Sequence, residues 1–447
     1  MKYRIILAAL CVSLSVCARA TTWYATSSGS HGASLNINTT GLWKPTSTGT
    51  CTGSGTALVW GAQAANDTFN TNGCGFIEVN VDPFTGSTTL TGTLSFTHYS
   101  TAVTGVGTSF TTQVSAGDWI FMANAPVALV ASVTDNTHLV LSTTCPGCSN
   151  GYTGPTASGT ASDGIVHLVN SGTQAGFTDT VQTTSHTIHA DITGIGCGDG
   201  LSGFNLNFWI NQTTTGITTT IYGGVTSCST SGNKALFLDQ AATSTVVING
   251  NVTTNSVGGS LALVVDSTSG SPATQPLTVI NGDVNSLNGV AVSSGNNVGY
   301  GLVTVNGNVY PGPQGTGSCG PNHNGIVLTQ SQSATINGFC YGSNACTSTY
   351  GCVAGSGEFK ITGGIINGLL SPGVQFNGAA RVLFVPSSTA SYELWPADSS
   401  YTLGVIDSHA TEMPANPGVS NVKLGTAYGT YVGIYAPTAS GPYGCTQ

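Results

Sequence analysis

The sequence predicts an all-β protein: a single-stranded right-handed parallel β-helix, or solenoid, with a small inserted β-sandwich or barrel module near the N-terminus. Two features of the sequence carry this prediction. A five-residue phrase recurs along the second half of the chain, and a second apolar segment lies between successive phrases. Neither segment is joined to the next by a stretch with helical periodicity, so the repeating unit consists of strands and loops.

The recurring phrase reads apolar, any residue, Gly or Ala, any residue, apolar. Its copies start 25 to 33 positions apart. A repeat of 20 to 50 residues is typical of stacked architectures, in which each unit buries its apolar face only against its neighbours. The phrase occurs at Ile188–Ile192, Ile221–Val225, Ile248–Val252, Ile280–Val284, Val305–Val309, Ile336–Cys340 and Ile361–Ile365.

The second apolar segment predicts a second strand in each repeat. Two strands per repeat favour a parallel β-helix over a solenoid of strands and helices. Loops such as 267–275 and 311–324 account for the unequal repeat lengths, because solenoids tolerate variable loops on a constant stack. These strands are expected at Ala235–Leu238, Leu261–Val265, Gly289–Val292, Gly325–Leu328 and Cys352–Ala354.

The chain divides into five predicted segments. A charged head with Lys2 and Arg4, an apolar run and the small-residue site Ala18-Arg19-Ala20 indicate a secretory signal peptide. Cys17 leaves a lipoprotein signal open as an alternative. The expected segments are the signal peptide at 1–20, a cap with the first β-helix turns at 21–96, an inserted β module at 97–150, the parallel β-helix at 151–410 and a C-terminal tail or cap at 411–447.

Charge excludes one class of partner. After residue 20 the chain keeps five basic residues against 17 acidic ones. Binding to nucleic acid requires clustered Lys and Arg to neutralise phosphates, so we expect no nucleic-acid partner. No other run approaches the roughly 18 apolar residues of a membrane-spanning helix, so we also expect no membrane span.

Cysteine usage predicts disulfides. Eleven cysteines follow the signal segment, and an exported protein with so many commonly pairs them, although the odd number leaves one free or intermolecular. Connectivity does not follow from the sequence, although proximity favours Cys51–Cys74, Cys145–Cys148, Cys197–Cys228 and two pairs among the four cysteines from Cys319 to Cys352. Zinc is an alternative at Cys145 and Cys148, but no second Cys-x-x-Cys completes a site. The candidates are Cys51, Cys74, Cys145, Cys148, Cys197, Cys228, Cys319, Cys340, Cys346 and Cys352.

Asparagines recur at the second position of the phrase. Asn249, Asn281, Asn306 and Asn337 occupy it in four consecutive copies. In a stacked fold they would form a ladder of side-chain amide hydrogen bonds, and the following glycine would suit a bend with positive φ. We therefore expect a structural role for this column rather than a ligand site.

Candidates for chemistry are few. A glycoside hydrolase needs two carboxyl groups roughly 5–10 Å apart, and Asp239, Asp266 and Asp283 could lie on adjacent turns. Solvated turn or strand-edge aspartates are the simpler interpretation, so no catalytic residue is assigned. His189 and Asp191 could share a strand face, but we expect no metal site and no cofactor there.

Three segments resemble known families. The region from Trp60 to Gly92 is similar to the first turns of exported β-helical surface proteins. Thr101–Phe110, Ala116–Ile120 and Ala131–Leu141 resemble a module of phage tail fibres and adhesins, which implies attachment rather than catalysis. Residues 414–433 resemble a short tail motif at the ends of surface fibres. The repeat as a whole resembles the right-handed β-helix of pectin-lyase-like secreted proteins.

Parallel β-helix proteins often act on polysaccharides, so the resemblance implies a polysaccharide-active enzyme as an alternative. However, the Asp-Asp, Gly-His-Gly and Arg-x-Lys motifs of polygalacturonase-like hydrolases are absent from this sequence. Pectate-lyase-like enzymes use a basic residue beside acidic groups, and Arg381 has no local acidic cluster. Tyrosines in or near the repeat loops could stack on sugars, although packing is the simpler interpretation. They are Tyr222, Tyr300, Tyr310, Tyr341 and Tyr350.

We therefore expect an exported, non-enzymatic surface or fibre protein, secreted or at the cell surface, that serves adhesion, structure, or receptor or glycan contact. The alternatives are a polysaccharide-active β-helix enzyme, either a lyase or a glycoside hydrolase, and a component of a phage tail fibre or spike. Glycans or a cell-surface receptor are the expected partners. A homotrimer or a filament is the oligomer that the fibre resemblance implies.

Overall fold

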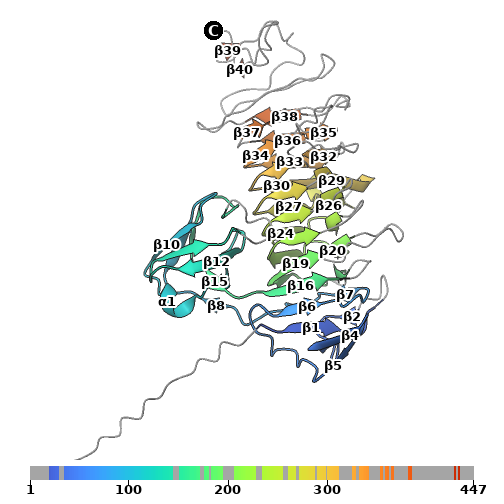
Figure 1. Cartoon of the computed structure of the whole chain (residues 1–447). Helices are drawn as coiled ribbons and strands as arrows, with labels where there is room; N and C mark the ends of the chain where they lie inside the picture. Colours follow the sequence, from blue (N-terminus) through green and yellow to red (C-terminus); the bar gives the residue numbers. More distant parts are fainter. Residues whose placement is uncertain are drawn as a thin grey trace, which may run out of the picture.

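The computed structural model describes residues 20–29, 35–143, 151–171, 176–180, 183–194, 206–227, 234–254, 260–267, 271–286, 289–298, 300–311, 325–328 and 332–341, with short strands between 353 and 432. Most of the strands in these ranges stack into a single column, and a smaller unit lies beside its lower half (Figure 1). The fold is nearly all β, and its helical elements in the described ranges are α1 (Phe110–Gln113) and the 3-10 helix Pro272–Thr274.

Three sheets form the column in the part of the chain that is described. Sheet 1 contains, in spatial order, β3 (Trp43–Lys44), β1 (Thr22–Ala25), β6 (Thr68–Asn70), β16 (Val166–Asn170), β19 (Ala190–Gly194), β22 (Val225–Ser227), β25 (Val252–Thr254), β28 (Val284–Ser286), β31 (Val309–Tyr310), β34 (Phe339–Tyr341) and β37 (Gly364–Ile366). Sheet 2 contains β2 (Leu35–Asn36), β7 (Ile77–Glu78), β17 (Phe177–Asp179), β20 (Leu206–Gln212), β23 (Lys234–Gln240), β26 (Ser260–Ser267), β29 (Gly289–Val298), β32 (Ile326–Leu328) and β35 (Val353–Gly355). Sheet 3 contains β18 (His186–Ile188), β21 (Thr218–Tyr222), β24 (Thr245–Asn249), β27 (Leu277–Ile280), β30 (Gly301–Val305), β33 (Gln332–Ile336), β36 (Glu358–Ile361) and β38 (Arg381–Phe384).

The chain visits the three sheets in a constant order. From β16 to β36 each turn supplies one strand to sheet 1, one to sheet 2 and one to sheet 3, and equivalent strands pair in parallel. This arrangement is compatible with a β-helix or solenoid. The prediction of two strands per repeat is wrong, because the repeated phrase is not one strand. Its first residue lies at or next to the end of a strand of sheet 3, and its last residue lies at or near the start of a strand of sheet 1.

Stacked apolar side chains explain the phrase. Ile221, Ile248 and Ile280 lie in register on consecutive strands of sheet 3, and each is fully buried. The last positions of the phrase, such as Val225 and Val252, stack in the same way on sheet 1. Because side chains alternate across a strand, one row fills the interior while its neighbours face outward. Full burial of one such side chain contributes about 1.5–3 kcal/mol, and the stack repeats it at every turn.

The glycine of the phrase is needed for close stacking. None of Gly250, Gly282, Gly307 and Gly338 is among the residues with positive φ, so the expected positive-φ bend is wrong. A Cβ atom on Gly282 would instead lie 2.6 Å from the carbonyl oxygen of Gly250, one turn below. The corners between sheets 3 and 1 therefore approach each other too closely for any side chain.

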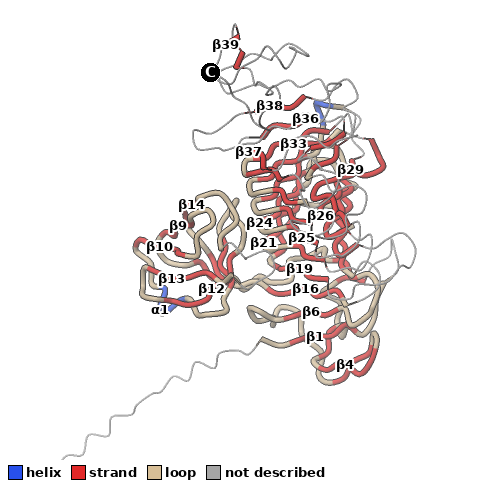
Figure 2. Tube along the Cα trace, turned by 45° about the horizontal axis from the view of Figure 1, so that its top comes forward, coloured by secondary structure: helices blue, strands red, loops and turns tan. Residues whose placement is uncertain are grey.

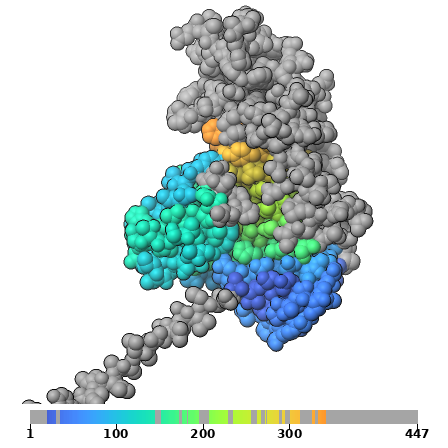
Figure 3. All heavy atoms as spheres, viewed as in Figure 1, coloured from blue at the N-terminus to red at the C-terminus, as the bar shows by residue number. Residues whose placement is uncertain are grey.

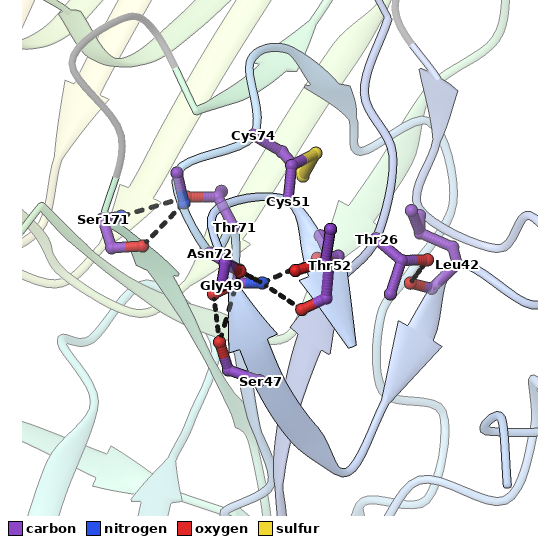
Figure 4. Close-up of a disulfide and its surroundings, with 12 residues drawn as sticks. Thr26, Leu42, Ser47, Gly49, Cys51, Thr52, Thr71, Asn72, Cys74 and Ser171 are labelled. Atoms are coloured by element: carbon purple, nitrogen blue, oxygen red, sulfur yellow. Dashed lines mark hydrogen bonds between the residues drawn. A yellow bond between two sulfur atoms is a disulfide. The ribbon is translucent and has the colours of Figure 1, made fainter. Parts of the chain in front are cut away.

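A disulfide closes the cap at the N-terminal end. Cys51 and Cys74 are bonded, as predicted, and they are 23 positions apart in the sequence (Figure 4). Beside them the Asn72 amide donates hydrogen bonds to the carbonyls of Gly49 and Thr52, each at 2.9 Å. The hairpin of β4 (Thr46–Gly49) and β5 (Thr52–Ser54) is thereby tied to the bottom turn of the column.

The smaller unit is an antiparallel sheet of eight strands within the described residues. Its order is β14 (Ala157–Gly159), β9 (Thr93–Phe96), β10 (Ala102–Val106), β13 (His138–Leu141), β12 (Ala128–Val133), β11 (Trp119–Phe121), β15 (Ser162–Asp163) and β8 (Thr88–Thr89). We call residues 88–163 the inserted module. It surrounds its own apolar core, separate from that of the column. No pairing joins β14 to β8, so the described sheet is not a closed barrel.

The inserted module takes the place of one strand. Between β7 of sheet 2 and β16 of sheet 1, where each later turn has a strand of sheet 3, the chain forms the module instead. Its strands start before and end after the predicted limits of 97–150. In Figures 1 and 2 the module lies against the side of the lower column, and the space-filling view in Figure 3 shows the two in contact.

Candidate functional site

The second position of the phrase forms a continuous column of side chains along the corner between sheets 3 and 1. Asn281 donates through Nδ2 to Oδ1 of Asn249 at 2.8 Å. Asn306 donates in the same way to Asn281, and Asn337 to Asn306, both at 2.6 Å. These asparagines therefore link one turn to the next, and the inner ones have no amide exposed for a ligand. Asn249 and Asn281 are each 1% exposed.

The fourth position of the phrase forms a second column that sequence reasoning missed. Here the side-chain oxygen of one turn accepts the backbone N–H of the next. Asp283 donates its N–H to Oδ1 of Asn251 at 2.8 Å, and Asn308 donates its N–H to Oδ1 of Asp283 at 2.7 Å. Phe339 donates likewise to Asn308 at 2.7 Å. The recurrence of Asn or Asp at this position in the sequence could have predicted this column, because both residues have a side-chain oxygen that accepts a hydrogen bond.

The structure brings together two of the three weak catalytic candidates. Asp239 and Asp266 lie in register on neighbouring strands β23 and β26, on the outer face of sheet 2. Burial raises the pKa of Asp239, and the negative charge of Asp266 raises it further. Asp283 lies elsewhere, at the corner where sheet 1 begins, and is held in the column of acceptors. A three-aspartate site is therefore ruled out.

Aromatic side chains lie beside this aspartate pair. Trp209 and Phe237 are in register on β20 and β23, and both point outward and remain partly exposed. Two residues further along the same strands, Asn211 and Asp239 are also in register. The outer face of sheet 2 thus combines an aromatic row with a row of hydrogen-bonding groups. Sequence reasoning named tyrosines in the loops and missed this pair.

One cation lies at the edge of the same surface. The ammonium group of Lys234 is 4.8 Å from the centroid of the Phe237 ring, within the range of a cation–π contact. Burial lowers the pKa of Lys234, and the charge of Asp266 opposes that shift. The surface therefore has both signs of charge, with two carboxyl groups against one ammonium.

The inserted module packs on the lower part of the corner through aromatic rings. Phe121 of β11 lies 5.1 Å from the ring of His189 and 4.7 Å from that of Tyr222, which are themselves stacked 5.0 Å apart. His189 also contacts Asp82, with 2.6 Å between Nδ1 and Oδ2. Tyr222 is thus a packing residue, and His189 is bound to Asp82 rather than to Asp191.

A second contact between module and column lies higher on the corner. The Tyr99 hydroxyl from the module donates to Oδ2 of Asp283 at 3.4 Å and lies 2.8 Å from the Tyr310 hydroxyl. Nδ2 of Asn308 donates to Tyr310 at 2.7 Å and also contacts Tyr99. Tyr310 therefore belongs to this contact rather than to an exposed sugar platform.

Two buried acids lie near the bottom of the column and were not predicted. Glu78 accepts hydrogen bonds from the Thr178 hydroxyl and from the N–H and hydroxyl of Thr180. Asp179 lies 3.2 Å from Nε2 of His186, and burial raises its pKa to about 6 despite that partner. Both carboxyl groups are fully buried, so they affect the stability of the column and are not accessible to a ligand.

The remaining predictions divide by location. Cys340 is disulfide-bonded, as Cys51 and Cys74 are. The other candidate cysteines, Cys145, Cys148, Cys197, Cys228, Cys319, Cys346 and Cys352, lie outside the described residues or their described side chains. Within the described ranges, no three His, Cys, Asp or Glu side chains are grouped as a metal site would require. No helix in those ranges is long and apolar enough to cross a membrane.

Comparisons with protein-family models, with curated proteins and with solved structures found no match to this chain.

Proposed function

We propose that this is an exported, non-enzymatic surface or fibre protein that contacts glycans or a cell-surface receptor through the outer face of sheet 2. Its proposed architecture is a right-handed parallel β-helix of the pectin-lyase-like kind, carrying an attachment module like those of tail fibres and adhesins. Export is supported by the charged and apolar N-terminal segment and by the Cys51–Cys74 disulfide, since disulfides persist in oxidising compartments.

The observation that carries the proposal is the pairing of an aromatic row with a polar row on one sheet face. Trp209 and Phe237 offer flat apolar faces, and the partly exposed Asn211 and Asp239 offer acceptors two residues further along the same strands. Asp266 lies beside Asp239 but is only 4% exposed, so it adds charge rather than a direct contact. A sugar ring has an apolar face and a rim of hydroxyl donors, so it matches both rows. Aromatic side chains supply much of the contact energy in such sites, while a few polar groups fix orientation.

The charge of this surface favours a neutral glycan over an acidic one. The two carboxyl groups of Asp239 and Asp266 outnumber the ammonium group of Lys234, and the chain as a whole is acidic. Uronate or sulfate groups would meet like charges, which disfavours binding. Neutral hexose hydroxyls would instead donate to the partly exposed Asp239 carboxylate.

One observation favours the enzymatic alternative, a lyase or glycoside hydrolase. Asp239 and Asp266 are adjacent and in register, and neighbouring strands lie about 4.8 Å apart. Retaining glycosidases place two carboxyl groups about 5–5.5 Å apart, so the pair suits that separation. A raised pKa at Asp239 is also what a general acid needs.

A glycan array separates these functions. We expect the mature chain to bind neutral glycans and to generate no new reducing ends or unsaturated products. The W209A/F237A double variant should lose most of the signal, whereas Asp135→Asn on the exposed part of the module should keep it. Binding that survives W209A/F237A would refute the proposed surface. Turnover that D239N/D266N abolishes and D135N preserves would establish the enzyme instead.

The tail-spike alternative predicts a different assembly. A spike should run as an SDS-resistant trimer, and light scattering on the mature chain measures the mass directly. A stable trimer would place the protein with fibre and spike components, and a monomer would favour a cell-surface protein that acts as a single chain.

A further inference from the structure

Three hydrogen bonds hold the inserted module on two successive turns of the corner between sheets 3 and 1. The backbone N–H of Val127 donates to the Asn249 carbonyl at 3.0 Å, and the Thr153 hydroxyl donates to Oδ1 of Asn251 at 2.7 Å. One turn higher, the Tyr99 hydroxyl donates to Asp283. The first two contacts use neutral groups, so their strength does not depend on protonation. The third uses a carboxyl group.

The Asp283 carboxyl group is enclosed by the module and the corner together. It is 2% exposed, and its hydrogen-bond donors are the Asn308 backbone N–H and the Tyr99 hydroxyl. Among the side chains that the structure describes, no Lys, Arg or His forms an ion pair with it. A buried carboxylate that lacks a cation is costly, and a buried carboxylic acid is much less so. Burial accordingly raises the pKa of Asp283 to about 7, although both donors oppose the shift.

The column of acceptors does not require an acid at this position. Asn251 and Asn308, one turn below and one turn above, make the same contact through an amide oxygen. An asparagine at 283 would preserve the column and could not ionise. The column therefore does not explain why position 283, which Tyr99 contacts, has a side chain that can ionise.

We propose that Asp283 and Tyr99 form a proton-dependent latch, which holds the inserted module on the corner while the carboxyl group is protonated and loosens it when that group ionises. When the module lifts away, Asp283 meets water and its pKa returns toward the ordinary value of about 4. The docked state thus has the higher pKa. Docking is strongest below the undocked pKa, weakens as the pH rises to about 7, and changes no further above it.

Other titratable groups border the contact. At the latch itself, the ring of His98 stacks 3.9 Å from that of Tyr99, and Tyr310 lies on the column side. Lower on the corner, Trp119 of the module packs against His167, which is in register with Asp191, and Phe121 packs against His189, which bonds Asp82. Burial lowers the pKa of His167, so this lower contact weakens in acid, opposite to the latch.

A comparison with Asp283→Asn isolates the latch, because the other groups are identical in the two proteins. Hydrogen–deuterium exchange of the module segment around Tyr99 is measured for both full chains, side by side, from pH 5 to pH 8. The ratio of the two exchange rates should rise with pH by up to about tenfold per unit and become constant above pH 7. Asp239→Asn, on sheet 2, should behave as the unaltered chain does.

A second variant tests the module side of the contact. Tyr99→Phe removes a donor that favours the ionised carboxylate, so the pH at which the module loosens should move upward. The latch is refuted if the unaltered chain and Asp283→Asn exchange in a constant ratio across this range. It is refuted equally if Tyr99→Phe leaves the transition pH in place or moves it downward.

Discussion

At the scale of single residues, the corners of the column depend both on the missing side chain of a glycine and on the side-chain oxygen of its neighbour. The glycine of each phrase contributes no side chain, and the neighbouring Asn or Asp contributes one oxygen at a fixed distance from the next turn. Buried acids such as Asp179 and Asp283 add groups whose ionisation is costly. Substitutions at these corner positions should therefore change the free energy of unfolding more than most surface substitutions do.

Alanine at a corner glycine should destabilise the protein. A Cβ on Gly282 would lie 2.6 Å from the Gly250 carbonyl oxygen, so two turns would have to separate. We expect Gly282→Ala to lower the free energy of unfolding by about 1–3 kcal/mol in urea titrations. Gly301→Ala is the matched control, because its Cβ meets nothing closer than 3.9 Å. Equal effects of the two variants would contradict the stacking explanation.

The Asp179–His186 pair should make stability depend on pH. Burial raises the pKa of Asp179, and although burial opposes it, the hydrogen bond and charge of Asp179 raise that of His186. Both folded values exceed the unfolded ones, so both groups stabilise the fold at low pH. The contribution of Asp179 is lost as the pH rises from its ordinary pKa of 3.8 to about 6, and that of His186 is lost as the pH rises above the ordinary histidine pKa of 6.5.

This dependence can be measured by urea unfolding at pH 5 and pH 8. Asp179→Asn should reduce the difference in unfolding free energy between the two pH values by about 1–2 kcal/mol. Asp135→Asn, at an exposed position, should leave that difference unchanged, because hydrogen bonds from Thr137 lower the pKa of Asp135 to about 2, below this range. A pH response in Asp179→Asn as large as in the unaltered chain would show that other groups cause it.

At the scale of elements, the corners between sheets 3 and 1 contribute more than the individual strands to holding successive turns in register. The described strands of sheets 1 and 3 are two to five residues long and make few hydrogen bonds each, and the two side-chain columns join the corners between them. Each net hydrogen bond contributes about 0.5–1.5 kcal/mol, and a buried partner left without a bond costs about 1–3 kcal/mol. The columns therefore fix the register of one turn on the next.

Position within the asparagine column should determine how much each amide contributes. Asn281 bonds to Asn249 below and to Asn306 above, and it is buried. We expect Asn281→Ala to cost about 1–3 kcal/mol in thermal or urea unfolding. Asn337, which is exposed at the upper end, should cost about 1 kcal/mol or less on the same change. The reverse order would show that the amide column is not what stabilises the corner.

At the scale of the whole molecule, one column carries a module in place of a strand. The column has a continuous apolar core, and the inserted module has its own. The two meet at the corner of sheets 3 and 1, while the outer face of sheet 2, with Trp209 and Asp239, belongs to the column alone. We therefore expect changes at the module contact to leave the proposed glycan surface intact.

The disulfide should stabilise the end of the column. The Cys51–Cys74 bond joins two cysteines that are 23 positions apart and ties the β4–β5 hairpin to the bottom turn (Figure 4). Removing such a crosslink typically costs about 2–4 kcal/mol. The C51S/C74S variant should therefore unfold at lower urea concentration and be cut faster by protease within residues 46–74. Unfolding and cleavage at the rates of the unaltered chain would contradict this role.

Part of this architecture follows from the sequence alone. The apolar positions of the phrase predicted the stacked core, because strands with in-register Ile and Val can bury them only against copies of themselves. The segments expected between phrases lie within β23, β26 and β29 or overlap β32 and β35. The close pair Cys51 and Cys74 is bonded. These features are local or repeat at a fixed position, so periodicity reveals them.

Only the tertiary structure decided the rest. That the phrase is a corner, that its glycine serves close stacking, and that Asp239 faces Asp266 while Asp283 faces Tyr99 all depend on which turn lies against which. Tyr99 and Asp283 are 184 positions apart in the sequence. No local pattern encodes such a contact, because it arises from the packing of the inserted module on the column.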